Sequence, residues 1–183
     1  MASPSKEKNV LKLILENSPL KEWHFEELVR EAKVTRLVAN KWIKKYVSLK
    51  LIKRIKERNR FPYYTVGSDN PIYYSLKKLY VLEQFYDSGL ISQLLSLRKA
   101  KTIILFGSMI KGDWYKDSDI DIFIFGESSD FDKSEFEIKL KRDIELHLFK
   151  DKKEINEVKT GLIKNVINGL VIKGQIQDFA EVI

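Results

Sequence analysis

Residues 105–125 read LFGSMIKGDWYKDSDIDIFIF. This stretch runs from the end of one apolar segment, through a Gly-Ser pair, to a second apolar segment that begins around Asp119 and Asp121. The second segment alternates in character, which predicts a strand with both carboxylates on one face, near its beginning. Carboxylates in such a place are costly unless something pairs with them. The residues around the two aspartates should therefore indicate what this partner is.

The residues before the two aspartates predict a turn that binds phosphate. Residues 101–106, KTIILF, give a continuous apolar run, which is typical of a strand covered on both faces. Gly107 supplies a sharp turn, and Ser108 begins a short segment whose amides and hydroxyl suit an anion. Two neighbouring carboxylates repel each other unless a divalent cation lies between them, and Mg²⁺ accepts carboxylate together with phosphate oxygens. The combination indicates a site for a nucleoside triphosphate and magnesium.

The joint spacing of these residues resembles a known signature. The pattern G-S-x-x-x-G-x5-S-D-x-D is similar to that of the polymerase β-type nucleotidyltransferase superfamily, especially its small minimal members. It is carried here by Gly107, Ser108, Gly112, Ser118, Asp119 and Asp121. The resemblance implies that the serine and backbone amides hold the triphosphate, while the two aspartates bind two Mg²⁺ ions. It also implies a third acid on a neighbouring strand that helps to activate the acceptor hydroxyl.

The remaining site residues depart from the family pattern. Residues 143–149, DIELHLF, predict the third strand, and Glu145 takes the position where the family usually has aspartate. Two interpretations stay open for His147: contact with substrate, or an ordinary strand histidine, which we favour. Lys111 stands where the family often has arginine. A lysine here keeps a positive charge near the phosphates but lacks the bidentate hydrogen bonding of arginine. The alternative is that Lys111 is simply a solvated side chain. The predicted metal-binding and catalytic residues are Asp119, Asp121 and Glu145, and the predicted nucleotide-binding residues are Gly107, Ser108, Lys111, Gly112 and Ser118.

The first third of the chain predicts three helices and a hairpin. Helical spacing of apolar residues covers residues 10–16 and 25–32, and a third helix begins at Thr35, a suitable N-cap, and runs to about residue 47. Residues 51–66 predict a two-stranded hairpin. The order resembles the winged helix-turn-helix family, in which the third helix enters the DNA major groove. The resemblance implies DNA contacts from Arg36, Asn40, Lys41 and Lys44 on the third helix and from Arg58 and Arg60 on the wing. Lys50 is a departure, because a glycine commonly ends this helix.

Charge is distributed unevenly along the chain. The protein has a net charge of +7, but residues 1–66 hold 16 Lys and Arg against 7 Asp and Glu, whereas the remainder is slightly acidic. Residues 33–60 alone hold 11 basic side chains and one acid, Glu57. Such a density favours binding of a polyanion, and a protein-interaction winged helix with a solvated basic face is the alternative. Absence of cysteine excludes disulfides and thiolate zinc sites, and no apolar run is long enough to cross a membrane, so we expect a cytoplasmic protein.

The segment after the hairpin predicts a boundary between domains. Residues 67–74, GSDNPIYY, lack helical periodicity, and two helices broken at residues 87–89 follow them. The first of these helices carries an apolar stripe that is typical of a core or of a dimer seam, formed by Leu76, Leu79, Tyr80, Leu82 and Phe85. A homodimer is therefore expected to form along this helix.

The remaining tail predicts a helix over about residues 153–168, a strand at 170–172 and a final short helix. We thus expect an α+β chain: a winged helix-turn-helix (1–66), a linker and helical connector (67–98), and a small mixed sheet (99–183) with helices mainly on one face. The function expected is Mg²⁺-dependent transfer of a nucleoside monophosphate to a hydroxyl acceptor. The alternatives are a DNA-binding transcription regulator whose second domain senses nucleotide or dimerises without catalysis, and an antitoxin that modifies or masks a toxin.

Overall fold

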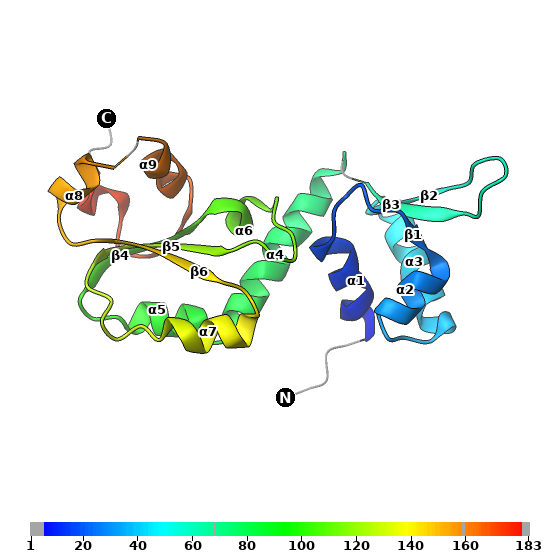
Figure 1. Ribbon diagram of the computed structural model, residues 1–183, viewed down its shortest axis with the longest axis horizontal. Coiled ribbons are helices and arrows are strands. Elements are labelled where there is room, and N and C mark those ends of the chain that lie inside the picture. The colour runs from blue at the N-terminus through cyan, green and yellow to red at the C-terminus, as the bar shows by residue number, and fades with distance from the viewer. Residues whose placement is uncertain (1–5, 68, 159, 181–183) are drawn as a thin grey trace. The chain divides into compact units, whose positions relative to one another are not determined.

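The computed structural model describes residues 6–67, 69–158 and 160–180, and the chain divides into two compact units, Met1–Ser75 and Leu76–Ile183 (Figure 1). We call them the N-terminal and C-terminal units. Helices and strands occur in both, which confirms a mixed α+β protein. None of the helices in the described ranges is long and apolar enough to cross a membrane.

The N-terminal unit packs three helices beside a small antiparallel sheet. Its elements are α1 (Lys6–Glu16), β1 (Trp23–His24), α2 (Phe25–Glu31), α3 (Arg36–Ser48), β2 (Ile52–Ile55) and β3 (Tyr63–Val66), with sheet order β1-β3-β2. The three helices and the hairpin confirm the sequence prediction. Strand β1 was not predicted, because two residues are too few to show an alternating pattern.

Helix α3 shows why its sequence forms a helix with one buried side. The Thr35 side chain accepts a hydrogen bond from the Val38 amide, as expected of an N-cap. The predicted inward positions Ala39, Ile43 and Tyr46 are all buried, being at most 3% exposed. Four basic or amide side chains predicted to face outward are exposed, namely Arg36, Asn40, Lys41 and Lys44. The amphipathic period of the sequence therefore predicts the exposed face of α3 correctly.

The end of α3 adopts the conformation that a glycine usually provides. Lys50 has φ of +57°, in the left-handed region that costs a residue with a Cβ about 1–2 kcal/mol. The Asn70 side-chain amide donates to the Leu49 and Lys50 carbonyls, both at 3.1 Å, and so satisfies the last carbonyls of the helix end. Lys50 thus occupies the glycine-like position despite its side chain.

We expect Lys50→Gly to stabilise the N-terminal unit by about 1 kcal/mol, because glycine adopts this φ without steric cost. Thermal unfolding of the variant followed by circular dichroism measures the change. Lys44→Gly is the matched control: it places glycine in the middle of the same helix and should destabilise by about 1 kcal/mol. Equal destabilisation by both substitutions would contradict the assignment of strain to Lys50.

Helix α4 (Pro71–Asp87) begins earlier than predicted. Residues 71–74 were expected to be non-helical, but proline is favoured in the first turn of a helix and the Asn70 side chain accepts a hydrogen bond from the Ile72 amide. The predicted apolar stripe is buried only in part, because Leu79 is 62% exposed, whereas Lys77, which lies outside the stripe, is buried. Helix α5 (Leu90–Ser96) follows a break at Asp87–Gly89, as predicted.

The C-terminal unit is built on a four-stranded mixed sheet of order β6-β5-β4-β7. Strand β5 runs parallel to β6 and antiparallel to β4, and β7 pairs antiparallel with β4. The elements from β4 onward are β4 (Ala100–Phe106), α6 (Gly107–Lys111), β5 (Ile120–Gly126), α7 (Lys133–Leu140), β6 (Ile144–Phe149), α8 (Lys152–Asn156), α9 (Thr160–Ile167), β7 (Leu170–Lys173) and the 3₁₀ turn η1 (Ile176–Asp178). The predicted strands at 101–106, 119–125 and 170–172 are confirmed within one residue at each end.

Helices cover both faces of this sheet, so the expectation of helices mainly on one face is wrong. On one face Phe123 and Phe125 pack with Ile155 of α8 and Val166 of α9. On the other face the isoleucines of β5 are no more than 1% exposed, and Figure 1 places α5 and α7 on that side. The continuous apolar runs of β4 and β5 require cover on both faces, because each strand presents apolar side chains alternately to the two sides.

The tail differs from the prediction in one respect. The single helix expected over residues 153–168 is two helices, α8 and α9, and the predicted range includes residue 159, which lies outside the described residues. Thr160 and Gly161 stand at the start of α9, and both are poorer helix formers than the residues on either side, which favours a new start there.

Candidate active site

The site is assembled where β4 ends and β5 and β6 begin. Asp121 is the cross-strand partner of Phe106 on β4 and of Glu145 on β6, while Phe123 is the partner of His147. Because partners in register project to the same side of a sheet, this pairing brings Asp121, Glu145 and His147 onto one face.

Three side chains converge within ligand distance of one another. One ligand atom from each of Asp121, Glu145 and His147 lies within 4.8 Å of the other two. Among the residues that the structure describes, there is no second group of this kind. The His147 Nε2 atom is 3.4 Å from Glu145 Oε1 and 4.0 Å from Asp121 Oδ1. This nitrogen is enclosed by protein yet makes no hydrogen bond. We call the three residues the acid–histidine cluster. Their carboxylate and imidazole donors fit a divalent cation.

Gly107 provides the space in which the Asp121 carboxylate lies. It has φ of +76°, and a Cβ built on it would come within 1.8 Å of Asp121 Oδ2. No residue with a side chain could occupy the position without displacing that carboxylate. The glycine of the Gly-Ser turn is therefore required for close approach as well as for its backbone angle.

The electrostatics of the cluster favour a bound cation. The pKa of Asp121 is raised, first by burial and then by the negative charges of Glu145 and Asp119, while His147 and Lys111 act in the opposite direction. A carboxyl group with a raised pKa lacks sufficient compensation for its charge. A cation held between the carboxylates would supply this compensation.

Asp119 lies outside the acid–histidine cluster. It immediately precedes β5 and its side chain is exposed, although its charge acts on Asp121. The structure therefore brings together two of the three predicted acids, Asp121 and Glu145, and adds His147, which the sequence favoured as an ordinary strand histidine. The in-register pairing of β5 and β6 brings His147 to the cluster. The sequence signal for it is that residues 145 and 147 lie two apart on one strand and so face the same side.

Four of the five predicted nucleotide-binding residues lie on the short helix α6 or at its C-cap, and the fifth, Ser118, lies in the loop before β5. Gly112 ends α6 with φ of +87°, and its amide donates to the Ser108 carbonyl. The Lys111 amine donates to Asn165 Oδ1 of α9 at 3.0 Å, so it is not simply solvated. The Ser118 hydroxyl accepts a hydrogen bond from the Tyr115 amide at 2.8 Å, which places it in the loop before β5.

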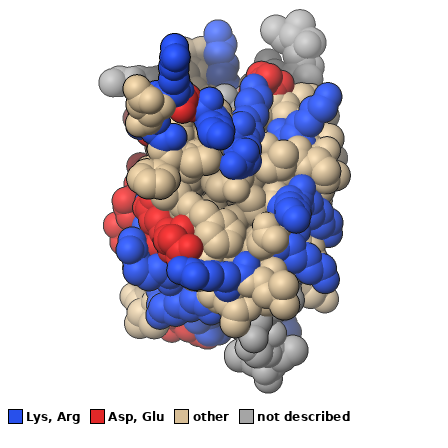
Figure 2. Space-filling view, turned by 90° about the vertical axis from the view of Figure 1, so that its right-hand side faces the viewer, with Lys and Arg blue, Asp and Glu red and all other residues tan. Residues whose placement is uncertain are grey.

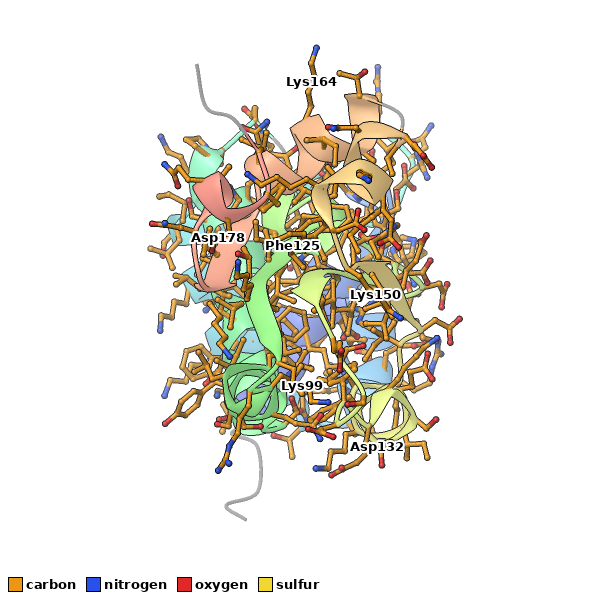
Figure 3. All side chains as sticks on the ribbon, turned by 90° about the vertical axis from the view of Figure 1, so that its left-hand side faces the viewer. Lys99, Phe125, Asp132, Lys150, Lys164 and Asp178 are labelled. Atoms are coloured by element: carbon orange, nitrogen blue, oxygen red, sulfur yellow. The ribbon has the colours of Figure 1, made fainter. Side chains whose placement is uncertain are left out.

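A hollow lies at the opposite end of β5 from Asp121. It has a volume of about 470 Å³ and is lined by Lys99, Lys101, Phe125, Gly126, Glu127 and Lys150. Figure 3 looks at this end of the unit and labels Lys99, Phe125 and Lys150. Its only described acid, Glu127, is paired with Lys99 at 3.0 Å. The hollow therefore lacks the pair of carboxylates that a magnesium site needs.

Comparison with known families agrees with this geometry. Residues 90–177 match the family model described as "Polymerase beta, Nucleotidyltransferase". The C-terminal unit carries a nucleotidyltransferase-like domain. The matched range contains the Gly-Ser turn and the whole acid–histidine cluster. Proteins of this family generally use divalent metal, which fits the donor set described above.

Solved structures give further similarities, whereas no curated protein matches the chain. The structure titled "Crystal structure of the toxin-antitoxin with AMP-PNP" is 26% identical, covers 49% of this chain and 73% of that chain, and has a TM-score of 0.37. A mutant of the toxin-antitoxin pair MntA-HpeT is 25% identical, with 50% and 75% coverage and a TM-score of 0.36. The solution structure of the DNA-binding TubR fragment from Clostridium botulinum is 19% identical, with 38% and 93% coverage and a TM-score of 0.31.

Proposed function

We propose that this protein is a divalent-metal-dependent nucleotidyltransferase that transfers a nucleoside monophosphate from a nucleoside triphosphate to a hydroxyl group of an acceptor. The observation that carries the proposal is the acid–histidine cluster lying against Gly107. Asp121 and Glu145 would hold the cation, with His147 beside them and Asp119 approaching from the loop. When bound there, a divalent cation neutralises charge on the phosphate oxygens.

The protein's own residues supply binding and proton transfer. The Gly107-Ser108 turn and the Lys111 amine would bind the triphosphate, since backbone amides and a lysine suit its charge. The Glu145 carboxylate is exposed and lies at the edge strand of the sheet, so an acceptor hydroxyl can reach it. In this position it would accept the hydroxyl proton as the oxygen attacks the α-phosphorus and pyrophosphate leaves.

Label transfer tests the proposal directly. The full chain is incubated with Mg²⁺ and each α-labelled triphosphate in turn, with and without cell lysate. We expect label on a discrete protein, RNA or small-molecule species. Tight nucleotide binding without transfer in any lysate would instead support a regulator whose second unit binds nucleotide without catalysis.

We further propose that the N-terminal unit is a winged helix-turn-helix that binds DNA. Exposed Asn40, Lys41 and Lys44 lie on α3, and Arg58 extends from the hairpin. On the face viewed in Figure 2, Lys and Arg side chains gather around a patch of uncharged surface. Two of the six predicted contacts already have partners in the free protein. Arg36 bonds Glu26 at 3.0 Å, and Arg60 bonds both Glu22 and Glu57. These arginines would have to exchange a carboxylate for a phosphate.

DNA affinity should fall steeply with salt, because phosphate contacts release counterions. We expect Lys41→Gln and Lys44→Gln each to reduce the slope of log K against log salt by about 1. Fluorescence anisotropy with a labelled duplex between low and physiological salt measures the slope. Lys12→Gln on α1 is the control, and an equal effect there would assign binding to general surface charge.

Dimer formation is part of the proposal. Leu79 and Tyr86, which are seven residues apart on α4, are 62% and 73% exposed. Apolar residues at this spacing lie on one helical stripe, which suits pairing with a second copy of the same helix.

A further inference from the structure

The loop between α6 and β5, residues 113–119, is fixed by two cationic side chains that the sequence did not single out. The Arg142 guanidinium donates to the Tyr115 carbonyl at 2.7 Å and to the Ser118 carbonyl at 2.9 Å. The Lys77 amine donates to the Trp114 carbonyl. Hydrogen bonds from charged donors are stronger than neutral ones. Three carbonyls of one short loop are thus held by side chains from distant parts of the chain.

The backbone on both sides of Asp119 is hydrogen-bonded to two consecutive residues, Arg142 and Asp143. The Ser118 carbonyl, in the peptide before Asp119, accepts from Arg142. The Ile120 amide, in the peptide after it, donates to the Asp143 carbonyl at 2.9 Å. With both flanking peptides fixed, only the rotamer of Asp119 itself remains free to direct its carboxylate.

The turn that carries Arg142 is itself held in place. The Arg142 amide donates to the Glu137 carbonyl of α7, and the Glu137 side chain accepts from the Ile144 amide at 3.0 Å. The latter bond contributes first to a lowered pKa of Glu137. These bonds therefore connect the backbone of Asp119 to the start of β6, the strand that carries Glu145.

The other half of the loop is anchored through Trp114. This residue is fully buried, stacks on Tyr80 with ring centroids 5.9 Å apart, and lies under the Lys77 amine at 4.6 Å. The Arg142 guanidinium lies 5.1 Å from the same ring. Contacts of cations with the indole face add to the hydrogen bonds. Lys77 is only 1% exposed, and this burial lowers the pKa of its amine to about 8.

We propose that Arg142 is a positioning residue that fixes the backbone of Asp119 so that its carboxylate completes the cation site formed by Asp121 and Glu145, and that Lys77 holds the preceding half of the loop. This inference rests on the proposed function. Arg142 acts through Asp119 and does not itself contact substrate. Its loss frees a peptide, so it should weaken cation binding by about 10-fold, the lower end of the effect seen when groups that orient metal ligands are removed.

A double-mutant cycle on the full chain tests the inference, with Mn²⁺ as the probe and free Mn²⁺ measured by electron paramagnetic resonance. The variants are Arg142→Gln, Asp119→Asn and both together. We expect each single change to weaken Mn²⁺ binding and the double change to be no weaker than Asp119→Asn alone, because the two residues act as one unit. Additive effects in the cycle would overturn the proposal.

Controls separate positioning from loss of folding. Arg98→Gln removes an exposed arginine of the same unit and should leave Mn²⁺ affinity unchanged. Arg142→Lys keeps one donor group and should fall between wild type and Arg142→Gln, while Lys77→Met should weaken binding less than Arg142→Gln does. If Arg142→Gln does not fold, Arg142→Lys takes its place in the cycle. If Asp119→Asn leaves Mn²⁺ binding unchanged while Asp121→Asn weakens it, the cation site stands and the roles of Asp119 and Arg142 in it are wrong. If Asp121→Asn also leaves binding unchanged, the proposed cation site is wrong. If only the Arg142 variants leave binding unchanged, the site stands and the positioning role is wrong.

Discussion

Asp121→Asn is expected to lower nucleotide transfer by on the order of 10³-fold, comparable to the loss of a key charge-stabilising group in other active sites. The reason is that Asp121 is the member of the acid–histidine cluster that lies between the Gly-Ser turn and Glu145. Neutral asparagine keeps the shape of the side chain but not the charge that a cation needs. Label transfer from the preferred triphosphate measures the change.

The stability of this variant, in contrast to its transfer rate, should not fall. The raised pKa of Asp121 means that its ionised form is disfavoured in the folded protein, so at neutral pH the charge reduces stability. Removing the charge should therefore leave the unfolding midpoint unchanged or raise it. Lost transfer together with retained stability identifies a functional carboxylate.

Asp117→Asn is the matched control, since Asp117 is an exposed acid of the loop that precedes β5 and lies outside the cluster. Its transfer rate should stay within about 2-fold of wild type, in line with the small effects of most surface substitutions. DNA affinity should be unchanged in both variants, because the cluster and the basic face belong to different units. Undiminished transfer by Asp121→Asn would refute the proposed enzyme.

Gly107→Ala is expected to lower nucleotide transfer about as much as Asp121→Asn does, while destabilising the protein only modestly. The added methyl group would overlap Asp121 Oδ2, which lies 1.8 Å from the position that the alanine Cβ would take, and the carboxylate must rotate away. A side chain can make this movement at small cost, so the loss of stability should be mainly that of a left-handed φ, about 1–2 kcal/mol. Transfer assays and thermal unfolding measure the two effects.

Gly89→Ala isolates the contribution of the backbone angle. Gly89 has φ of +85°, close to that of Gly107, but no atom lies within 4 Å of a Cβ built on it. Both variants should therefore lose similar stability, and only Gly107→Ala should lose transfer. If Gly89→Ala reduced transfer as much, the loss would have to be attributed to strain in the unit and not to displacement of Asp121.

Much of the local structure follows from the sequence. Thr35 caps α3 as its position predicts, and the apolar period places Ala39 and Ile43 inside. The alternation in β5 correctly places Asp121 opposite the isoleucine face. Each of these features depends on neighbours within a few residues, so the sequence pattern contains the information needed.

The errors concern contacts between distant segments. Helices were expected mainly on one face of the sheet. The apolar run of β4 does indicate cover on both faces, but no local pattern in α5 or α7 shows that these helices supply it. The burial of Lys77 on α4 was also not predicted, and its amine donates to a backbone carbonyl 37 positions away. No periodicity in α4 could have predicted a buried lysine.

The sequence by itself determined the order of most of the elements, with β1 and the division between α8 and α9 as exceptions. It also determined the uneven charge along the chain and the spacing from Gly107 to Asp121, because these are properties of short stretches. The tertiary structure alone decided which side chains meet. Register between β5 and β6 joined His147 to Asp121 and Glu145, and Arg142 held the loop that carries Asp119. The physical reason is that strand pairing and side-chain hydrogen bonds connect residues far apart in the chain, whose meeting depends on how the whole unit packs.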